Sequence, residues 1–235
     1  MDVQSVMREL EALGTERTKR SYLSRGVREP LFGVATGAMK PLKKRIGVDQ
    51  ELAAELWDTG NYDAMYFAGM IADTRVMTEA DFDRWIDDAY CALISDFIVA
   101  VTLAESPLAQ PVADRWIRSG DENRASAGWA CYEWLLGWRP DAYFEGETIR
   151  ELLGLAAATI HEAPPRVQRA VRNFIVAVGV SYAPLHDDAL RTADDIGVVE
   201  VVVNGERTPL ASAAEQIRAA AAKGRIGFKR RAVRC

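Results

Sequence analysis

The chain has few of the residues on which metal sites and common enzyme mechanisms depend. Its 235 residues include three cysteines and two histidines. Cys91, Cys131 and Cys235 are widely spaced and form no C-x-x-C pair, so the sequence predicts neither a disulfide framework nor a cysteine zinc site. With only His161 and His186 available, we expect no histidine metal centre, no serine–histidine triad and no cofactor.

Several sequence signatures of phosphate binding and hydrolysis are also absent. The chain contains no G-x-x-x-x-G-K-[ST], G-x-G-x-x-G, G-x-S-x-G or H-E-x-x-H. Their absence argues against a P-loop nucleotidase, a dinucleotide-binding fold, an α/β-hydrolase and a zincin. Any chemistry must therefore depend on other groups.

Long apolar runs are missing as well. No stretch reaches the roughly 18–20 uninterrupted apolar residues that a membrane span needs. The first nine residues include Asp2 and Glu9 and are not followed by the apolar core of a signal peptide. We therefore expect a cytoplasmic protein with no membrane association, and the composition, 49% hydrophobic and 27% charged, is typical of a globular chain.

Basic residues are concentrated at the two ends of the chain. Residues 1–48 hold ten Lys and Arg against five Asp and Glu, and residues 223–235 hold six basic residues and no acid. With a net charge of −5 overall, the middle segment 49–222 carries −16. Basic ends on an acidic body fit an anionic partner such as nucleic acid, although a charged tail that only maintains solubility is an equal alternative.

Helix signals recur at short intervals along the chain. Asp49, Asn61 and Thr78 each place a capping side chain before an apolar stripe, and prolines or glycines mark further starts and breaks. The patterns predict helix pairs at 49–59 with 61–73, 78–89 with 90–105, 109–119 with 121–138, and 147–161 with 164–182. A pair recurs every 30–40 residues, which is typical of a HEAT-like α-solenoid, and a compact helical bundle is the alternative.

Two segments differ from these pairs. VVEVVVNGERTPL at 198–210 is rich in valine and contains Asn204–Gly205, so we expect a small β-hairpin at about 198–208. A last helix at about 209–223 then leads into the basic tail, 223–235. Near the N-terminus, Thr36 is expected to cap a short basic helix. The sequence thus predicts one all-α domain, 1–235, with a C-terminal hairpin and a basic tail.

Asp96 interrupts an apolar helix, CALISDFIVAVTLAES. A carboxylate in such a run is unfavourable unless it is hydrogen-bonded, paired or faces a groove. One interpretation is that Asp96 points outward or bonds a neighbouring helix. The other is that it lies in a cleft and stabilises developing positive charge.

Arg166, Arg169 and Arg172 are spaced to form one stripe on a helix that starts near Pro164. Such a stripe suits contacts to successive phosphates, and pairing with acids of the preceding helix is the alternative. The aromatic residues are expected mainly in the core, where any one could instead stack on a base. The six tryptophans are Trp57, Trp85, Trp116, Trp129, Trp134 and Trp138.

The chain resembles the DNA alkylation repair proteins with HEAT-like repeats, the AlkD-type alkylpurine DNA glycosylase superfamily. The resemblance looks closest to a bacterial branch with a hairpin and a basic tail, and it runs in collinear order over nearly the whole chain. The matching stretches are EPLFGVATGAMKPLKKRI, ELAAELWDTGNYDAMYFAGMIAD, SAGWACYEWL, IHEAPPRVQRAVRNFIVAVG, VVEVVVNGERTPLA and KGRIGFKRR.

The resemblance implies roles for particular residues. Active members excise cationic alkylpurines with a catalytic aspartate, two tryptophans and a phosphate-binding arginine. The aspartate matches Asp96, whereas the two tryptophan positions fall on Ala92 and Asn173. The arginine position falls at or near Ser126, with Arg124 two residues away as a substitute.

Two functions follow from the sequence and the resemblance. One is a repair-type protein that binds duplex DNA in a concave groove, as a glycosylase acting through Asp96 if the chemistry is retained. The other is a non-enzymatic HEAT-like scaffold for nucleic acid or protein. The residues expected to contact DNA are Arg124, Arg166, Arg169, Arg172, Lys43, Lys44, Lys229, Arg230 and Arg231.

Overall fold

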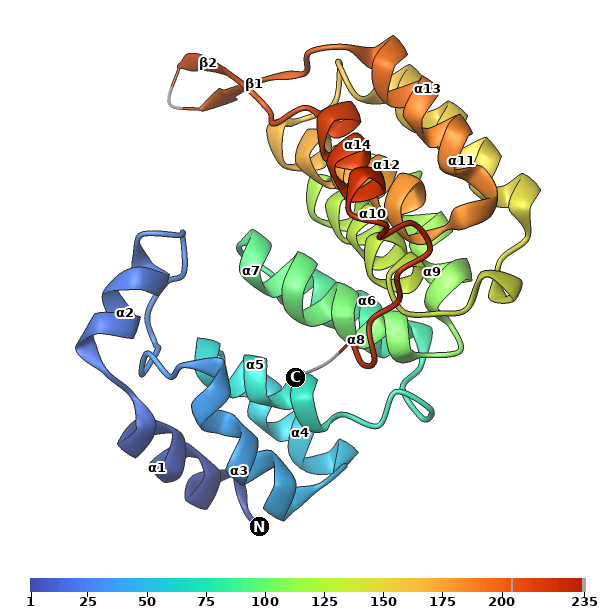
Figure 1. Ribbon diagram of the computed structural model, residues 1–235. Helices are drawn as coiled ribbons and strands as arrows, with labels where there is room; N and C mark the ends of the chain where they lie inside the picture. The colour runs from blue at the N-terminus through green and yellow to red at the C-terminus, as the bar shows by residue number, and fades with distance from the viewer. Residues whose placement is uncertain (204, 234–235) are drawn as a thin grey trace. The chain divides into compact units, whose positions relative to one another are not determined.

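The computed structural model describes residues 1–203 and 205–233, which form helices and one small two-stranded sheet. The chain divides into two compact units: unit 1, Met1–Val112, and unit 2, Ala113–Val233 (Figure 1). No helix among the described residues is both long and apolar enough to cross a bilayer. The sequence predicts a single domain, and the division into two units is compatible with it, because solenoid repeats contact mainly their neighbours. The single domain stays a prediction.

All regular elements in the described part of unit 1 are helices. Its elements are α1 (Val3–Leu13), α2 (Glu16–Leu23), α3 (Thr36–Ile46), α4 (Gln50–Asp58), α5 (Tyr62–Ile71), α6 (Glu79–Asp88), α7 (Ala92–Ile94), the π-helix η1 (Ser95–Val99) and α8 (Ala100–Glu105). The caps expected at Asp49, Asn61 and Thr78 are all formed, and Thr78 makes a full capping box with Asp81.

The core of unit 1 is built on α5, which is buried over most of its length. It packs against α3, α4 and η1. Trp57 of α4 and Trp85 of α6 stack with ring centroids 4.1 Å apart. Gly69 allows η1 to approach α5 closely, because a Cβ at this position would lie 2.7 Å from Ile98 Cγ2.

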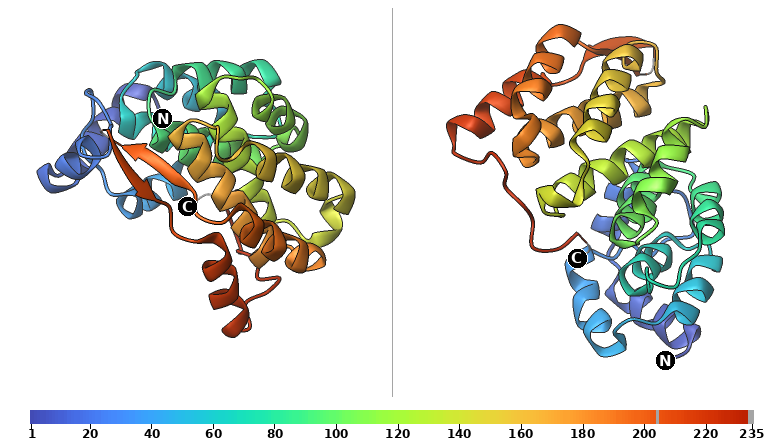
Figure 2. Two further views of the ribbon diagram at one scale, coloured as in Figure 1. Left: turned by 90° about the horizontal axis from the view of Figure 1, so that it is seen from above. Right: turned by 90° about the vertical axis from the view of Figure 1, so that its right-hand side faces the viewer.

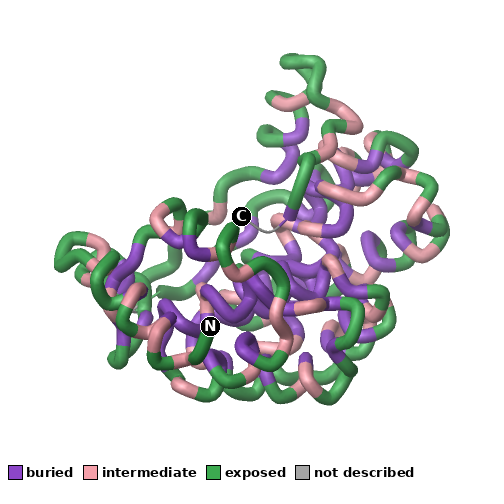
Figure 3. Tube along the Cα trace, turned by 90° about the horizontal axis from the view of Figure 1, so that it is seen from below, coloured by how far each residue is buried: buried purple, intermediate pink, exposed green. Residues whose placement is uncertain are grey.

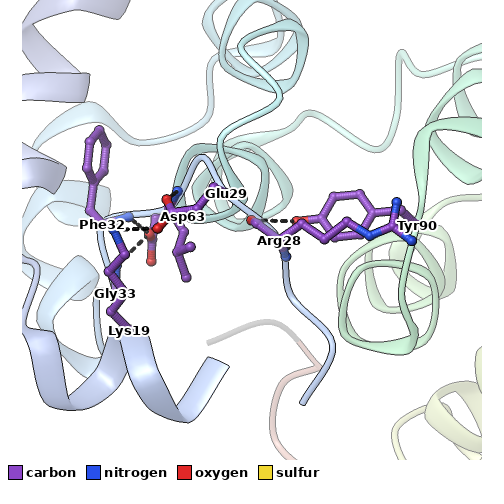
Figure 4. A network of polar contacts seen from close by, with 8 residues as sticks. Lys19, Arg28, Glu29, Phe32, Gly33, Asp63 and Tyr90 are labelled. Carbon is purple, nitrogen blue, oxygen red and sulfur yellow. Dashed lines mark hydrogen bonds and ion pairs between the residues drawn. The ribbon is translucent and has the colours of Figure 1, made fainter. Parts of the chain in front are cut away.

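A buried carboxylate fixes the loop between α2 and α3. Asp63 is fully buried and accepts backbone N–H groups from Phe32, Gly33 and Val34 at 2.6–2.9 Å (Figure 4). Burial raises the pKa of Asp63, and the three amide donors act in the opposite direction. Sequence patterns did not single out Asp63, because its partners lie about 30 residues away.

Unit 2 contains the longest helices. Its elements are α9 (Ala109–Ile117), which begins at the end of unit 1, α10 (Glu122–Leu136), the short 3₁₀-helix η2 (Asp141–Tyr143), α11 (Gly146–Thr159), α12 (Pro165–Ser181), the 3₁₀-helix η3 (Ala183–Leu185), α13 (His186–Ile196), β1 (Glu200–Val203), β2 (Glu206–Pro209) and α14 (Ala213–Ala222). Helix α12 is central, since it packs against α10, α11, α13 and α14. Buried and exposed stretches alternate along the helices (Figure 3).

The predicted hairpin is present. β1 and β2 pair antiparallel, with Val201 opposite Thr208 and Val203 opposite Glu206. Three of the four β1 residues and all of β2 are exposed, and the two strands extend beyond the helices of unit 2 (Figures 1 and 2). The predicted turn residue Asn204 lies outside the described residues.

The all-α class and the predicted helix pairs are confirmed, with three corrections. The helix expected at 90–105 is interrupted by the π-helical segment Ser95–Val99, because an apolar pattern does not reveal a locally widened turn. Thr36 does not cap α3: it is the first helical residue, and the cap position is Ala35. The last helix begins at Ala213, because residues up to Pro209 pair in the hairpin.

Candidate nucleic-acid interface

Asp96 lies on the π-helical segment of unit 1. Its side chain is half-buried, and the Ser95 hydroxyl donates to its Oδ1 at 2.6 Å. A π-helical turn within a helix often marks a functional position, because it displaces side chains from the regular helical spacing. The carboxylate is therefore hydrogen-bonded and partly accessible, which combines features of both sequence interpretations.

The surroundings of Asp96 differ from the pattern implied by the resemblance. Ala92, four residues earlier, supplies no aromatic ring. Phe97, the next residue, leaves 49% of its surface exposed and is an aromatic side chain that sequence reasoning missed. The exposure of Phe97 could not be expected from the sequence, because an apolar run predicts buried side chains.

The three arginines of the α12 stripe have different environments. Arg169 is exposed, whereas Arg166 and Arg172 are half-buried. Arg166 donates to Asn123 Oδ1 of α10. Arg172 donates to the Ala211 carbonyl at 2.9 Å and also to polar groups beside α14, and its burial lowers its pKa. Arg169 is thus the member most available to an external phosphate.

Two positions singled out by the resemblance also lie in unit 2. Ser126 is fully buried in α10 and cannot act as a surface phosphate ligand. Arg124, half-buried in the first turn of the same helix, is closer to solvent. Asn173 is half-buried on α12, and its Oδ1 accepts a hydrogen bond from Arg172 at 3.1 Å.

The C-terminal basic segment folds against unit 2. Lys229 pairs with Asp141 at 2.8 Å and donates to the Leu136 carbonyl at 2.8 Å. The backbone N–H of Arg230 donates to the Gly137 carbonyl, and its guanidinium lies 4.4 Å from the Trp134 ring centroid. Arg231 is exposed. The segment is therefore a structural part of unit 2 over its described residues.

A concave site lies between α12, α14 and the C-terminal segment. We call this cavity of about 520 Å³ the basic pocket. It brings together Arg172, Asn173 and Arg230, three positions that the sequence analysis named, with Lys223 and Arg225. Its lining residues are Glu133, Gly137, Arg172, Asn173, Val176, Ala177, Val180, Ser181, Gln216, Ala219, Ala220, Lys223, Arg225, Phe228 and Arg230.

The remaining predicted residues are dispersed. Lys43 and Lys44 lie in the last turn of α3 in unit 1, with Lys44 exposed. Four tryptophans are buried in the cores, as expected, whereas Trp134 and Trp138 are half-buried beside arginines. Within unit 2, the arrangement can bind anions, because the described residues that line the pocket include four cationic side chains and a single carboxylate.

Comparisons with known proteins identify the family. The family model described as DNA alkylation repair enzyme matches residues 6–215. A solved structure described as a new family of proteins related to the HEAT-like repeat DNA glycosylases with affinity for branched DNA structures is 55% identical, with a TM-score of 0.97 over 100% of both chains. The predicted HEAT-like fold is thereby confirmed.

Two Listeria proteins are more distant relatives. The uncharacterized protein Lin0241 of Listeria innocua is 24% identical over 82% of this chain and 85% of its own length. The uncharacterized protein Lmo0209 of Listeria monocytogenes is 25% identical over the same shares. The match of the family model over most of the sequence establishes that this chain belongs to the DNA alkylation repair enzyme family.

Proposed function

We propose that this is a cytoplasmic protein that binds DNA without sequence preference and favours branched duplexes over linear ones. The basic pocket of unit 2 is the observation that carries the proposal. It gathers Arg172, Lys223, Arg225 and Arg230 around one concavity, where Glu133 is the only acid among the described lining residues, although residues 49–222 are strongly acidic. Contacts to phosphate need such local positive charge and carry no sequence information.

The availability of the cations supports this proposal. Arg169, Lys223 and Arg225 are exposed, and within residues 1–203 and 205–233 none of their side chains has an ion-pair partner. Arg231 is exposed as well. Preference for a branch point is proposed from the related solved structure, whose description names affinity for branched DNA at 55% identity to this chain.

A competition experiment tests this function. A labelled four-way junction is titrated with the protein, and unlabelled junction or linear duplex of equal length and composition is added at fixed salt. We expect the junction to compete at least tenfold more effectively. Equal competition would remove the preference for branches, and failure to bind either DNA would favour the scaffold for RNA or protein.

Excision of cationic alkylpurines is the second candidate function. It is favoured by one observation, a half-buried and hydrogen-bonded Asp96, at the position that the resemblance assigns to the family's catalytic acid. Departure of a cationic base needs no proton from the enzyme, so one carboxylate could stabilise the charge that develops on the sugar. Ala92 and Asn173 weigh against it, because they cannot form the aromatic walls that position the nucleotide.

A further inference from the structure

We infer that the basic pocket takes a single unpaired nucleotide of a DNA strand, with its phosphate among the cationic side chains and its base against the apolar wall. This inference deepens the proposed function and rests on it. It concerns a nucleotide without a partner base, such as one left at a branch or at a strand end. It involves no bond cleavage.

One wall of the pocket is formed by the C-terminal half of α12. Val176, Ala177 and Val180 give it an apolar surface of small and branched side chains. Asn173 adds an amide at one end of this surface. An apolar surface with a polar group at its edge suits a nucleobase, whose faces are apolar and whose edges form hydrogen bonds.

The second wall is α14, which lies close to α12 because of a glycine. A Cβ at Gly179 would lie 2.6 Å from Ile217 Cδ1, so only glycine permits this spacing. Ala219 and Ala220 of α14 face the pocket with methyl groups, and Gln216 adds a second amide. Small side chains on this wall leave the space open.

The third wall is the segment that follows α14. Gly227 donates its N–H to the Val180 carbonyl at 2.8 Å, and Arg230 donates its N–H to the Gly137 carbonyl at 2.7 Å. These two bonds hold the segment across the end of α12 and beside α10 (Figure 1). The segment contributes Lys223, Arg225 and Phe228 to the lining, and Phe228 leaves 60% of its surface exposed.

The positive charge of the pocket favours an anionic ligand over a neutral one. The hydrogen-bond acceptors of Arg172 are all neutral: an amide of Asn173, an amide of Gln216, and the carbonyls of Ala211 and Ser212. Burial lowers the pKa of this arginine, and Glu133 opposes the effect. A phosphate group close to the pocket would offset this desolvation and pair with the exposed cations.

The size of the pocket distinguishes a nucleotide from a phosphate alone. Its volume of about 520 Å³ lies within the range of about 300–1,000 Å³ that is typical of pockets for drug-sized ligands. A phosphate of an intact duplex backbone needs only surface cations and no cavity. The cavity, its apolar wall and the exposed Phe228 therefore indicate a base as well as a phosphate.

A pocket-filling variant tests the inference. Ala219→Trp places an indole in the pocket without changing charge, and Ala222→Trp, at an exposed position of the same helix outside the lining, is the matched control. Binding of thymidine 5′-monophosphate and of inorganic phosphate is measured by calorimetry. We expect the nucleotide to bind wild type and Ala222→Trp alike, and Ala219→Trp at least tenfold more weakly.

A second variant tests the inference without introducing an indole. Phe228→Ala should weaken nucleotide binding by roughly tenfold, as expected for loss of one stacking contact, and should leave phosphate binding unchanged. Equal affinity for phosphate and nucleotide would overturn the inference, as would unchanged nucleotide binding by Ala219→Trp. A fully paired four-way junction should bind wild type and the control Ala222→Trp alike, and failure of wild type to bind this junction would instead contradict the proposed function.

Discussion

The ammonium group of Lys229 lies 2.8 Å from the Asp141 carboxylate, and this pair joins the C-terminal segment to the short helix that follows α10. Neither side chain is more than a third exposed. The segment that the sequence predicts to be a basic tail is thus attached to unit 2 through the side chain of one of its own lysines. The backbone of the segment is therefore held beside the pocket, and the segment presents the exposed side chains of Lys223 and Arg225 there.

Replacing Lys229 should loosen this anchor. Lys229→Gln loses the ion pair and the bond to the Leu136 carbonyl, so we expect the free energy of unfolding to fall by about 1–2 kcal/mol. Hydrogen exchange of the Arg230 amide, measured by mass spectrometry or NMR, should accelerate. Arg231→Gln, which removes an exposed charge nearby, is the control and should change neither quantity; identical behaviour of the two variants would show that the anchor has no effect.

Gly69 should be intolerant of even a methyl group. A Cβ there would overlap Ile98, so Gly69→Ala is expected to destabilise unit 1 by about 1–3 kcal/mol in denaturant unfolding. Gly154 on α11 is exposed and has open space around it, so Gly154→Ala should stabilise by about 0.5–1 kcal/mol. A neutral effect at Gly69 would mean that η1 can move away from α5 without loss.

Asp63 should be needed as a carboxylate. In Asp63→Asn an amide group replaces one acceptor oxygen, so at least one of the three buried N–H donors loses its partner. We expect a loss of about 2–3 kcal/mol in unfolding free energy. Glu55→Gln, the same charge change at an exposed position of α4, should have little effect, and equal effects of the two changes would contradict the assigned role.

Base release from DNA that contains 7-methylguanine should not exceed spontaneous depurination. The reason is that Ala92 and Asn173 provide no aromatic walls around the nucleotide, so one carboxylate acts on a poorly positioned substrate. The measurement is chromatographic quantification of free base against a buffer control. Release above this background that disappears in Asp96→Asn would instead establish Asp96 as the catalytic residue that the resemblance implies.

Helices could be predicted from the sequence where local signals suffice. Asp49, Asn61 and Thr78 cap helices because their side chains reach backbone N–H groups two or three residues away, and such spacing is visible in a single chain. The hairpin could also be predicted, because the valine-rich run is a local signal in the sequence. The assignment of the family's aspartate position to Asp96 stays a prediction.

The features that shape the pocket could not be predicted in this way. The Lys229–Asp141 pair joins residues 88 positions apart, and Gly179 acquires its role only when Ile217 packs on it. The π-helical turn at Asp96 leaves the apolar pattern unchanged. Long-range packing determines these features, so propensity and periodicity carry no signal for them.

The salt dependence of junction binding tests the central claim most directly. The double variant Lys223→Gln/Arg225→Gln removes two cations of the basic pocket. The control variant Arg150→Gln/Arg191→Gln removes two cations outside the pocket, which pair with Glu147 within α11 and with Asp188 within α13. Both variants change the net charge equally. Kd for a four-way junction is measured between about 50 and 200 mM salt, where each phosphate contact contributes roughly 0.9 to the log–log slope.

We predict that the pocket variant binds the junction more weakly and that its slope is smaller by about 2, while the control variant keeps the wild-type slope. Identical slopes for the two double variants would contradict the claim that DNA is bound through the basic pocket of unit 2.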